Sequence, residues 1–426
     1  MLVCDDNCIH ILGLRMFDMK DVWSLICHRL SILDRQTPFE KLKELLCNID
    51  IDTKKSAISM AIGEPKHQTP KFIIEELESN LTGIATYPTT RGTNELKTTI
   101  INWLCQRFKL DRETLNEEKN ILPVNGTREA LFSIAQTIVN KATVNPIVIL
   151  PNPFYQIYEG AALLAGAEPY YLNCTEENNY IPDLSQIPTK IWERCQLFYL
   201  CSPGNPSGAV IDFNFAKELM RFADKYNFVI ASDECYSEIY HNEEQPPISL
   251  VEYAEKLGNS EYKRCLIFHS LSKRSNVPGL RSGFVAGDSE LIENFYRYRT
   301  YHGCAMPLHV QKASIAAWSN EEHVKKNRDI YRIKFLKVCS ELNSVLPMTP
   351  PSGGFYLWPK LPCSDLDFAR ELYKSENVEV LPGSYLSRSV DNINPGDNRV
   401  RIALVAETDI CVEAAKRIKR FIKNIH

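Results

Sequence analysis

The chain has 426 residues, of which 44% are hydrophobic and 24% are charged, and its formal net charge is −4. This composition is typical of a globular protein and gives no sign of a basic surface for nucleic acid or an anionic membrane. No stretch approaches the roughly 18 uninterrupted apolar residues that a membrane span needs. A chain of this length suits two packed domains better than one small core.

The 14 cysteines include no CxxC pair, so the sequence supports neither a zinc site nor a disulfide framework, and we expect no metal. Free thiols are typical of a reducing compartment, and we therefore expect a cytoplasmic protein. Residues 1–30 lack a basic start and carry several aspartates, which argues against a secretory signal or a transit peptide. We interpret them as a peripheral extension.

Predicted helices and strands alternate along most of the chain. Apolar residues at helical spacing predict helices over residues 39–47, 94–108, 127–139, 312–343 and 414–422. Short apolar runs predict buried strands at residues 147–150, 197–200, 228–231 and 265–268. This alternation predicts an α/β fold, with a large doubly wound, mostly parallel sheet domain and a smaller α+β domain. We assign residues 76–309 to the large domain, and residues 31–75 with 310–426 to the small one.

Polar or turn residues follow each of the four apolar runs directly, in PNPFYQIY, CSPGNPSG, SDECY and HSLSK. Open α/β sheets bind ligands beyond the carboxyl ends of their strands. The sequence therefore predicts one shared site at that edge of the sheet.

Asp233 follows the run at 228–231, so we expect its carboxylate to be withdrawn from water and to need a cationic partner. A salt bridge or a helix N-cap would satisfy it. Alternatively, it keeps the ring nitrogen of pyridoxal phosphate protonated, because an ion pair near 4 Å is worth on the order of 4 kcal/mol, about three pKa units. Tyr236 and Asn205 can donate to the phenolate oxygen of the same ring, although Asn205 is also an ordinary turn residue.

Lys273 lies where the last of these runs leaves the sheet, and its amine can form a Schiff base with the cofactor aldehyde and then move a proton. Its ordinary pKa of about 10.4 must fall for this role, and we expect Arg281 and the charged ring to lower it. Donors for the phosphate are offered by Arg281, Ser270, Gly126, Thr127 and Arg128.

Two further assignments stay open on pattern alone. Tyr155 can stack on the ring face, although it can equally belong to the core. In RVRIAL, Arg399 and Arg401 share one face of a predicted strand, and a buried arginine there suits bidentate capture of a substrate carboxylate.

Five motifs, NGTREAL, SPGNPSG, SDECY, SLSKRSNVPGLRSGF and RVRIAL, resemble the fold-type-I pyridoxal phosphate aminotransferases of class I and II in order and spacing. The resemblance runs from about residue 35 to the C-terminus. It implies that Lys273 is the Schiff-base lysine, Asp233 the ring-nitrogen partner and Arg401 the ligand of the substrate carboxylate. The remaining implied cofactor ligands are Tyr236, Asn205, Arg281, Ser270, Ser272, Gly126, Thr127, Arg128 and Tyr155.

The same resemblance implies an assembly and a substrate. Tyr87, in YPTTRG, matches a tyrosine that reaches the phosphate of the neighbouring subunit, which implies a homodimer with shared active sites. Gly63, in AIGEP, matches a position that lines the substrate pocket. PNPFYQIYEGAALLAGAEP and SLSKRSNVPGLRSGFVAGD are most similar to succinyldiaminopimelate aminotransferases of lysine and diaminopimelate biosynthesis. The implied substrates are N-succinyl-LL-2,6-diaminopimelate and 2-oxoglutarate.

Other functions are less well supported. An aspartate- or alanine-type aminotransferase and a lyase of the same fold stay open. The SLSK stretch fits the SxxK motif of penicillin-binding acyl enzymes, but the chain lacks the SDN and KTG motifs that those enzymes need. It also lacks the GxGxxG of a nicotinamide dehydrogenase.

Overall fold

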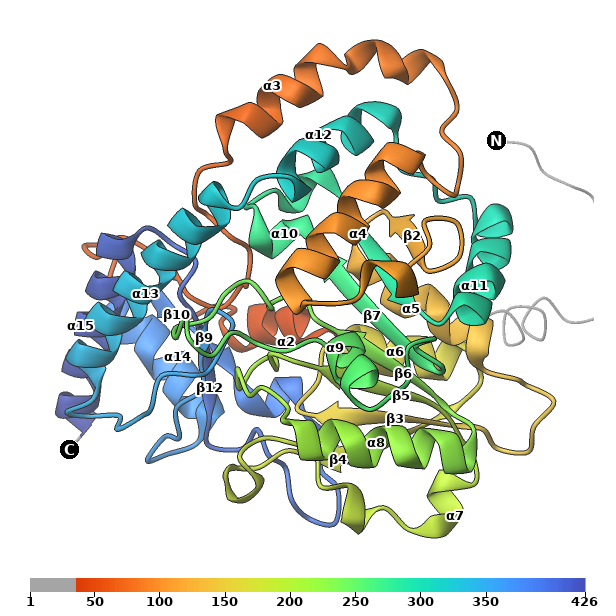
Figure 1. The fold of residues 1–426 in the computed structure, drawn as a ribbon. Helices are drawn as coiled ribbons and strands as arrows, with labels where there is room; N and C mark the ends of the chain where they lie inside the picture. Colours follow the sequence, from red (N-terminus) through yellow and green to blue (C-terminus); the bar gives the residue numbers. More distant parts are fainter. Residues whose placement is uncertain (1–35, 426) are drawn as a thin grey trace, which may run out of the picture. The chain divides into compact units, whose positions relative to one another are not determined.

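The structure is a computed structural model, and it describes residues 36–425. A seven-stranded sheet lies at the centre of the larger domain (Figure 1). Its order is β2-β8-β7-β6-β5-β3-β4, and within it β8 runs antiparallel to both neighbours while the other pairs are parallel. The strands are β2 (Ile121–Val124), β3 (Ile147–Asn152), β4 (Glu168–Asn173), β5 (Cys195–Cys201), β6 (Val229–Asp233), β7 (Cys265–Ser270) and β8 (Gly283–Gly287).

Helices cover both faces of this sheet, because successive strand residues point to opposite faces. Ile147 and Ile149 of β3 join a core cluster with residues of α3 (Lys71–Ser79), α4 (Asn94–Phe108), α7 (Thr189–Trp192), α8 (Phe213–Tyr226), α9 (Leu250–Lys256) and α12 (Leu308–Trp318). Val148 and Leu150 join the other, with α5 (Thr127–Ile138), α6 (Gln156–Leu164) and α11 (Ser289–His302). The predicted doubly wound, mostly parallel sheet is confirmed.

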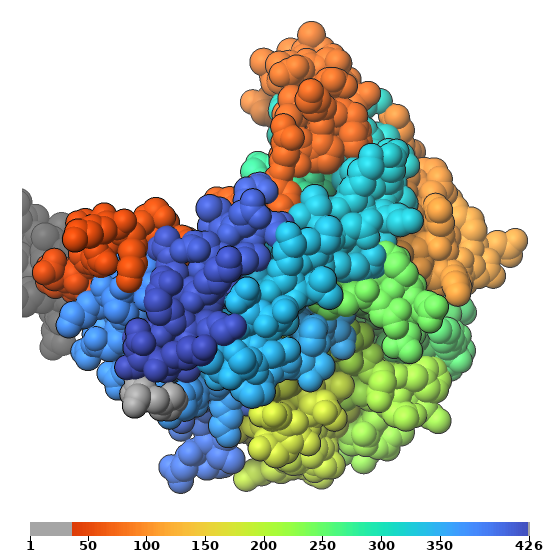
Figure 2. Space-filling model, turned by 90° about the vertical axis from the view of Figure 1, so that its left-hand side faces the viewer, coloured from red at the N-terminus to blue at the C-terminus, as the bar shows by residue number. Residues whose placement is uncertain are grey.

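A second core lies around two small sheets. One pairs β1 (Ile58–Ser59) with β10 (Val378–Glu379), and the other has the order β11-β12-β9. Figure 2 shows α13 and α15 side by side over this core. The remaining strands and helices here are β9 (Tyr356–Leu357), β11 (Leu381–Pro382), β12 (Val400–Ala403), α13 (Glu322–Leu342), α14 (Asp365–Glu376) and α15 (Thr408–Ile425).

Shorter helices lie between and before these elements. Helix α2 (Pro38–Leu45) begins at a capping box, in which Thr37 and Glu40 satisfy each other's backbone N–H groups. Helix α10 (Leu271–Arg274) directly follows β7. The 3-10 helices are η1 (Leu81–Ala85), η2 (Arg112–Thr114), η3 (Glu176–Asn178), η4 (Leu184–Gln186), η5 (Pro278–Leu280) and η6 (Gly383–Leu386).

One helix prediction is wrong. The single helix expected over residues 312–343 is two helices, α12 and α13, separated at Ser319 to Glu321. Arg274 donates from Nη1 to the carbonyl oxygen of Ala317 at 2.8 Å, and so satisfies the last turn of α12. Asn320 accepts a hydrogen bond from the backbone N–H of His323 at 3.1 Å, at the start of α13. The other predicted helices are confirmed as α2, α4, α5 and the later part of α15.

In the part of the chain that the structure describes, no helix is both long and apolar enough to cross a membrane. Residues 1–30, the predicted extension, lie outside the described residues. The domain boundaries at 31–75, 76–309 and 310–426 stay predictions.

Candidate active site

The predicted site residues, apart from Tyr87 and Gly126, line one cavity of about 630 Å³. Strands β5, β6 and β7 each contribute their last residue to it, namely Cys201, Asp233 and Ser270. This is the edge at which an open parallel sheet binds ligands. The other predicted residues on its wall are Gly63, Thr127, Arg128, Tyr155, Asn205, Tyr236, Ser272, Lys273, Arg281 and Arg401.

Lys273 is held at this edge by the four-residue helix α10. Ser270 caps the helix, because its hydroxyl accepts a hydrogen bond from the backbone N–H of Ser272 at 3.0 Å. The Lys273 amine donates to the carbonyl oxygen of Gly63 at 2.7 Å. The side chain therefore reaches from the large domain to the segment that carries β1.

The environment of Lys273 suits a base. Burial lowers its pKa to about 8, and the guanidinium groups of Arg401 and Arg128 act in the same direction. The sequence also led us to expect that Arg281 lowers this pKa. In the structure, the Arg281 guanidinium donates to the carbonyl oxygens of Pro278 and Asn125.

Asp233 is 5% exposed. Tyr158 donates its hydroxyl proton to Oδ2 at 2.7 Å, and the backbone N–H of Cys235 donates to Oδ1 at 3.3 Å. Both partners are uncharged, and burial raises the pKa of the Asp233 carboxyl above its usual range. A cation beside it in the cavity would reverse that shift. Sequence reasoning missed Tyr158, although PNPFYQIY contains it three residues after Tyr155.

Groups that suit an anion lie together where α5 begins. Gly126 precedes the helix with a φ of +84°, and a Cβ there would lie 2.2 Å from Nη2 of Arg281. The missing side chain lets that guanidinium lie against the helix start, where backbone N–H groups and the positive end of the helix dipole are exposed. Ser270 donates its hydroxyl proton to Oγ of Ser272 at 2.9 Å, which leaves the Ser272 hydroxyl to donate into the same cavity.

The structure separates the two arginines that the pattern left open. Arg401 lines the cavity and donates to Oδ1 of Asn205 at 3.1 Å. Arg399 donates to the carbonyl oxygen of Trp358 at 3.1 Å and pairs with Glu176 at 2.6 Å. Arg399 forms a β-bridge with Lys360 in the same register as the pairing of β9 with β12, so the alternation extends to it, and the two arginines are distinguished by the partners of their side chains.

Aromatic side chains complete the cavity wall. Tyr155 accepts a hydrogen bond from Nε of Arg128 at 2.8 Å. Tyr236 lies with its hydroxyl 3.0 Å from that of Tyr356, a cavity residue that sequence reasoning missed. The only available signal for Tyr356 was its place in SGGFYLW, after two glycines.

Residues 55–418 match the family described as aminotransferase class I and II. The chain belongs to this family. An LL-diaminopimelate aminotransferase from Aquifex aeolicus (strain VF5) is 32% identical to this aminotransferase over 375 residues, 87% of this chain and 92% of the relative.

Solved aminotransferase structures agree with this assignment. One from Neisseria meningitidis has a TM-score of 0.86 and 46% identity, and the match covers 91% of this chain and 98% of that one. A probable N-succinyldiaminopimelate aminotransferase from Thermus thermophilus shares the fold, with a TM-score of 0.79 and 24% identity over 90% of this chain and 100% of that one.

Pyridoxal phosphate is the cofactor of this aminotransferase family, and the site fits it. The buried Asp233 carboxylate has uncharged hydrogen-bond partners and suits a protonated ring nitrogen. The space that a Cβ of Gly126 would fill is occupied by the Arg281 guanidinium, which suits a phosphate at the start of α5. Lys273 opens into the same cavity.

Tyr87 lies apart from this cavity. Its side chain is 98% exposed, in the segment between η1 and α4. The structure describes one chain, so the expected contact of Tyr87 with a neighbouring subunit stays a prediction.

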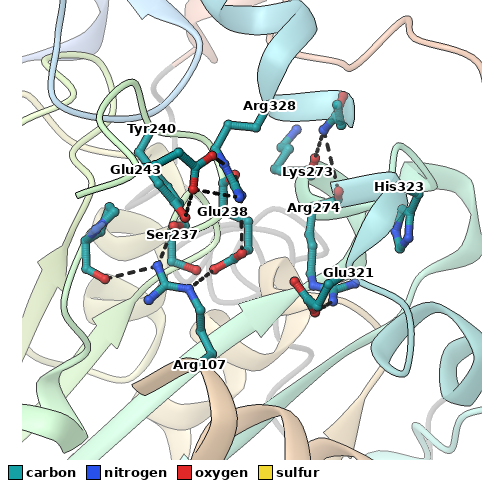
Figure 3. A network of polar contacts seen from close by, with 12 residues as sticks. Arg107, Ser237, Glu238, Tyr240, Glu243, Lys273, Arg274, Glu321, His323 and Arg328 are labelled. Carbon is teal, nitrogen blue, oxygen red and sulfur yellow. Dashed lines mark hydrogen bonds and ion pairs between the residues drawn. The ribbon is translucent and has the colours of Figure 1, made fainter. Parts of the chain in front are cut away.

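The residues after Tyr236 join a network of charged groups (Figure 3). Glu238, whose side chain is 4% exposed, accepts from Nε of Arg107 at 2.7 Å and lies 3.6 Å from Nη1 of Arg328. Arg328 also pairs with Glu243 at 2.8 Å. Although burial opposes it, the arginines hold the pKa of Glu238 below its usual range. The network joins α4 of the large domain to α13 through the segment that carries Tyr236.

Proposed function

We propose that this aminotransferase transfers the amino group of N-succinyl-LL-2,6-diaminopimelate to 2-oxoglutarate, in lysine and diaminopimelate biosynthesis. The likeness of PNPFYQIYEGAALLAGAEP and SLSKRSNVPGLRSGFVAGD to succinyldiaminopimelate aminotransferases supports this substrate. Relatives named for diaminopimelate support its chemical class. The observation that carries the chemistry is the single cavity in which Lys273, Asp233 and Arg401 meet.

The reacting groups would divide the chemistry as follows. When bound, the cofactor supplies an aldehyde for the amino group and a ring that draws electrons from the substrate carbon. Lys273 would hold the aldehyde, and its amine would move the proton at the substrate carbon, because a pKa of about 8 leaves part of it neutral at neutral pH. Asp233 would keep the ring nitrogen charged, while Tyr236 and Asn205 would donate to the phenolate oxygen.

The remaining residues would bind and orient. Arg401 would bind the substrate α-carboxylate, since its guanidinium lines the cavity beside Asn205. Gly63 would line the substrate side, and Tyr155 would stack on the ring. The phosphate would be held by Arg281, Ser270, Ser272, Gly126, Thr127 and Arg128. Arg128 would act through its backbone, which helps to form the start of α5.

We also propose a homodimer in which Tyr87 completes the phosphate site of the other subunit. Ile84 and Tyr87, three residues apart, are 74% and 98% exposed, and large exposed apolar side chains are typical of a contact surface. Light scattering should give twice the chain mass. Tyr87→Phe should keep that mass and lose cofactor affinity; a monomeric wild-type enzyme would overturn the proposal.

We also propose a cytoplasmic location. All 11 cysteines within residues 36–425 are free, which supports the proposal of a reducing, cytoplasmic compartment.

Turnover with 2-oxoglutarate tests the substrate. N-succinyl-LL-2,6-diaminopimelate should exceed aspartate and alanine in kcat/KM, with an oxo acid and glutamate as products. LL-diaminopimelate without the succinyl group is the second candidate, because the Aquifex relative carries that name. A clear preference for LL-diaminopimelate or aspartate would replace the proposed substrate. Release of ammonia or carbon dioxide without glutamate would indicate a lyase.

A further inference from the structure

We propose that Tyr356 is a positioning residue of this site, which directs the Tyr236 hydroxyl toward the cofactor and holds the Arg401 guanidinium for the substrate carboxylate. The inference rests on the proposed roles of Tyr236 and Arg401. Tyr356 is 3% exposed, lies on β9 and lines the cavity. It contacts Tyr236, which is proposed to bind the cofactor, and Arg401, which is proposed to bind the substrate.

The contact with Arg401 follows from strand register. Strand β9 pairs antiparallel with β12, with Tyr356 opposite Ala403. Arg401 lies two residues from Ala403, so it is a diagonal neighbour of Tyr356 on the same face. The Arg401 Cζ atom lies 4.4 Å from the centre of the tyrosine ring, which is a cation–π contact. The ring therefore supports one face of the guanidinium, whose Nη1 donates to Asn205 and whose Nη2 donates to the carbonyl oxygen of Ala61 at 2.8 Å.

The contact with Tyr236 is made by the hydroxyl. The two hydroxyl oxygens are 3.0 Å apart and both are buried. A phenol has one proton to donate and can also accept. When Tyr356 donates to Tyr236, the Tyr236 proton is left for a third acceptor in the cavity. Hydrogen bonds in such a chain polarise one another, so Tyr236 becomes a stronger donor.

The Tyr356 hydroxyl fits at this position because Gly63 has no side chain. A Cβ at position 63 would lie 1.9 Å from the Tyr356 hydroxyl oxygen. The phenol thus occupies the volume of the missing side chain, next to the carbonyl group that accepts from Lys273. Gly63→Ala should displace the ring together with its hydroxyl, because the added Cβ would also lie 2.7 Å from Cζ of Tyr356, and so weaken both contacts.

The test is a pH titration of the visible absorbance of the enzyme loaded with pyridoxal phosphate. Removing a donor from the phenolate oxygen destabilises the deprotonated state more than the protonated state, because the oxygen carries the full charge only in the deprotonated state. The midpoint of the titration should therefore rise. Tyr236→Phe should raise it by about one unit or more, the loss expected for a charge-assisted hydrogen bond. Tyr356→Phe, which acts through Tyr236, should raise it by a few tenths of a unit.

Two variants separate the roles of the hydroxyl and the ring. Tyr356→Phe keeps the ring under Arg401, so the KM for 2-oxoglutarate should be unchanged. Tyr356→Leu should raise that KM roughly 3- to 30-fold, as expected for a lost cation–π contact. Tyr331→Phe is the matched control, because this buried hydroxyl has no hydrogen-bond partner within residues 36–425. It should move neither quantity.

The outcomes are distinct. If Tyr236→Phe leaves the midpoint unchanged, the proposed role of Tyr236 is wrong and the inference falls with it. If Tyr236→Phe shifts the midpoint but Tyr356→Phe behaves like Tyr331→Phe, Tyr356 does not position Tyr236. Thermal unfolding of each variant identifies any loss of fold, and Tyr356→Phe removes a single oxygen atom.

Discussion

The lowered pKa of Lys273 predicts how fast the cofactor-free enzyme captures an aldehyde. Only a neutral amine attacks a carbonyl carbon. With a pKa of about 8 instead of 10.5, about 9% of Lys273 is neutral at pH 7 instead of about 0.03%. Capture at pH 7 should therefore be about 300-fold faster than for a lysine with the ordinary pKa.

Stopped-flow measurement of the visible band after mixing apoenzyme with pyridoxal phosphate tests this from pH 6 to 10. The neutral fraction of the Lys273 amine grows as pH rises. Because its pKa in the folded enzyme lies below the ordinary value, this growth takes place at lower pH than for an ordinary lysine. The rate constant should increase about tenfold per pH unit below 8 and become constant above it. Lys273→Ala should give no band, while its circular dichroism stays that of the wild type.

Two variants change the charges around Lys273 in opposite senses. Arg401 lowers the pKa of Lys273 and Glu64 raises it. Arg401→Gln should therefore move the midpoint of capture to higher pH, and Glu64→Gln should move it to lower pH. A wild-type midpoint near 10.5, or shifts of both variants in one direction, would refute the reasoning.

Two further predictions concern buried charges. Asp233→Ala should weaken cofactor retention by on the order of 4 kcal/mol, measured by equilibrium dialysis, because a pyridinium would lose its ion pair; unchanged retention would contradict the ring-nitrogen role. Glu238→Ala should lower the free energy of unfolding in urea by about 3–5 kcal/mol, because Arg107 and Arg328 would stay buried without their carboxylate. Glu261→Ala, at an exposed pair with Lys263, is the control and should have no measurable effect. Equal urea midpoints of unfolding for Glu238→Ala and Glu261→Ala would show that the network does not stabilise the fold.

The sequence predicted those parts of the site that depend on local pattern. Asp233 and Lys273 each follow an apolar run, and parallel strands bring such ends together whatever the rest of the chain does. The choice of Arg401 over Arg399 needed the partners of each side chain, Asn205 for Arg401 and Glu176 for Arg399, which alternation alone does not give. Tyr356 lies on a strand of two residues, and its role depends on pairing with a strand more than forty residues away.

The broken helix has a similar cause. Residues 312–343 have helical spacing throughout, but a carbonyl group of the last turn before the break at Ser319 is satisfied by Arg274, which comes from α10. Helix propensity of the segment carries no information about that partner.

The order in which the site's parts occur along the chain has a consequence for synthesis. The seven strands of the large sheet are complete at Gly287, whereas Tyr356 and Arg401 come far later. When the ribosome has synthesised the large domain, the chain already contains Lys273 and Asp233. It does not yet contain the arginine proposed to bind the substrate. A nonsense codon between positions 287 and 401 would therefore yield a polypeptide with the lysine and the carboxylate present and without that arginine.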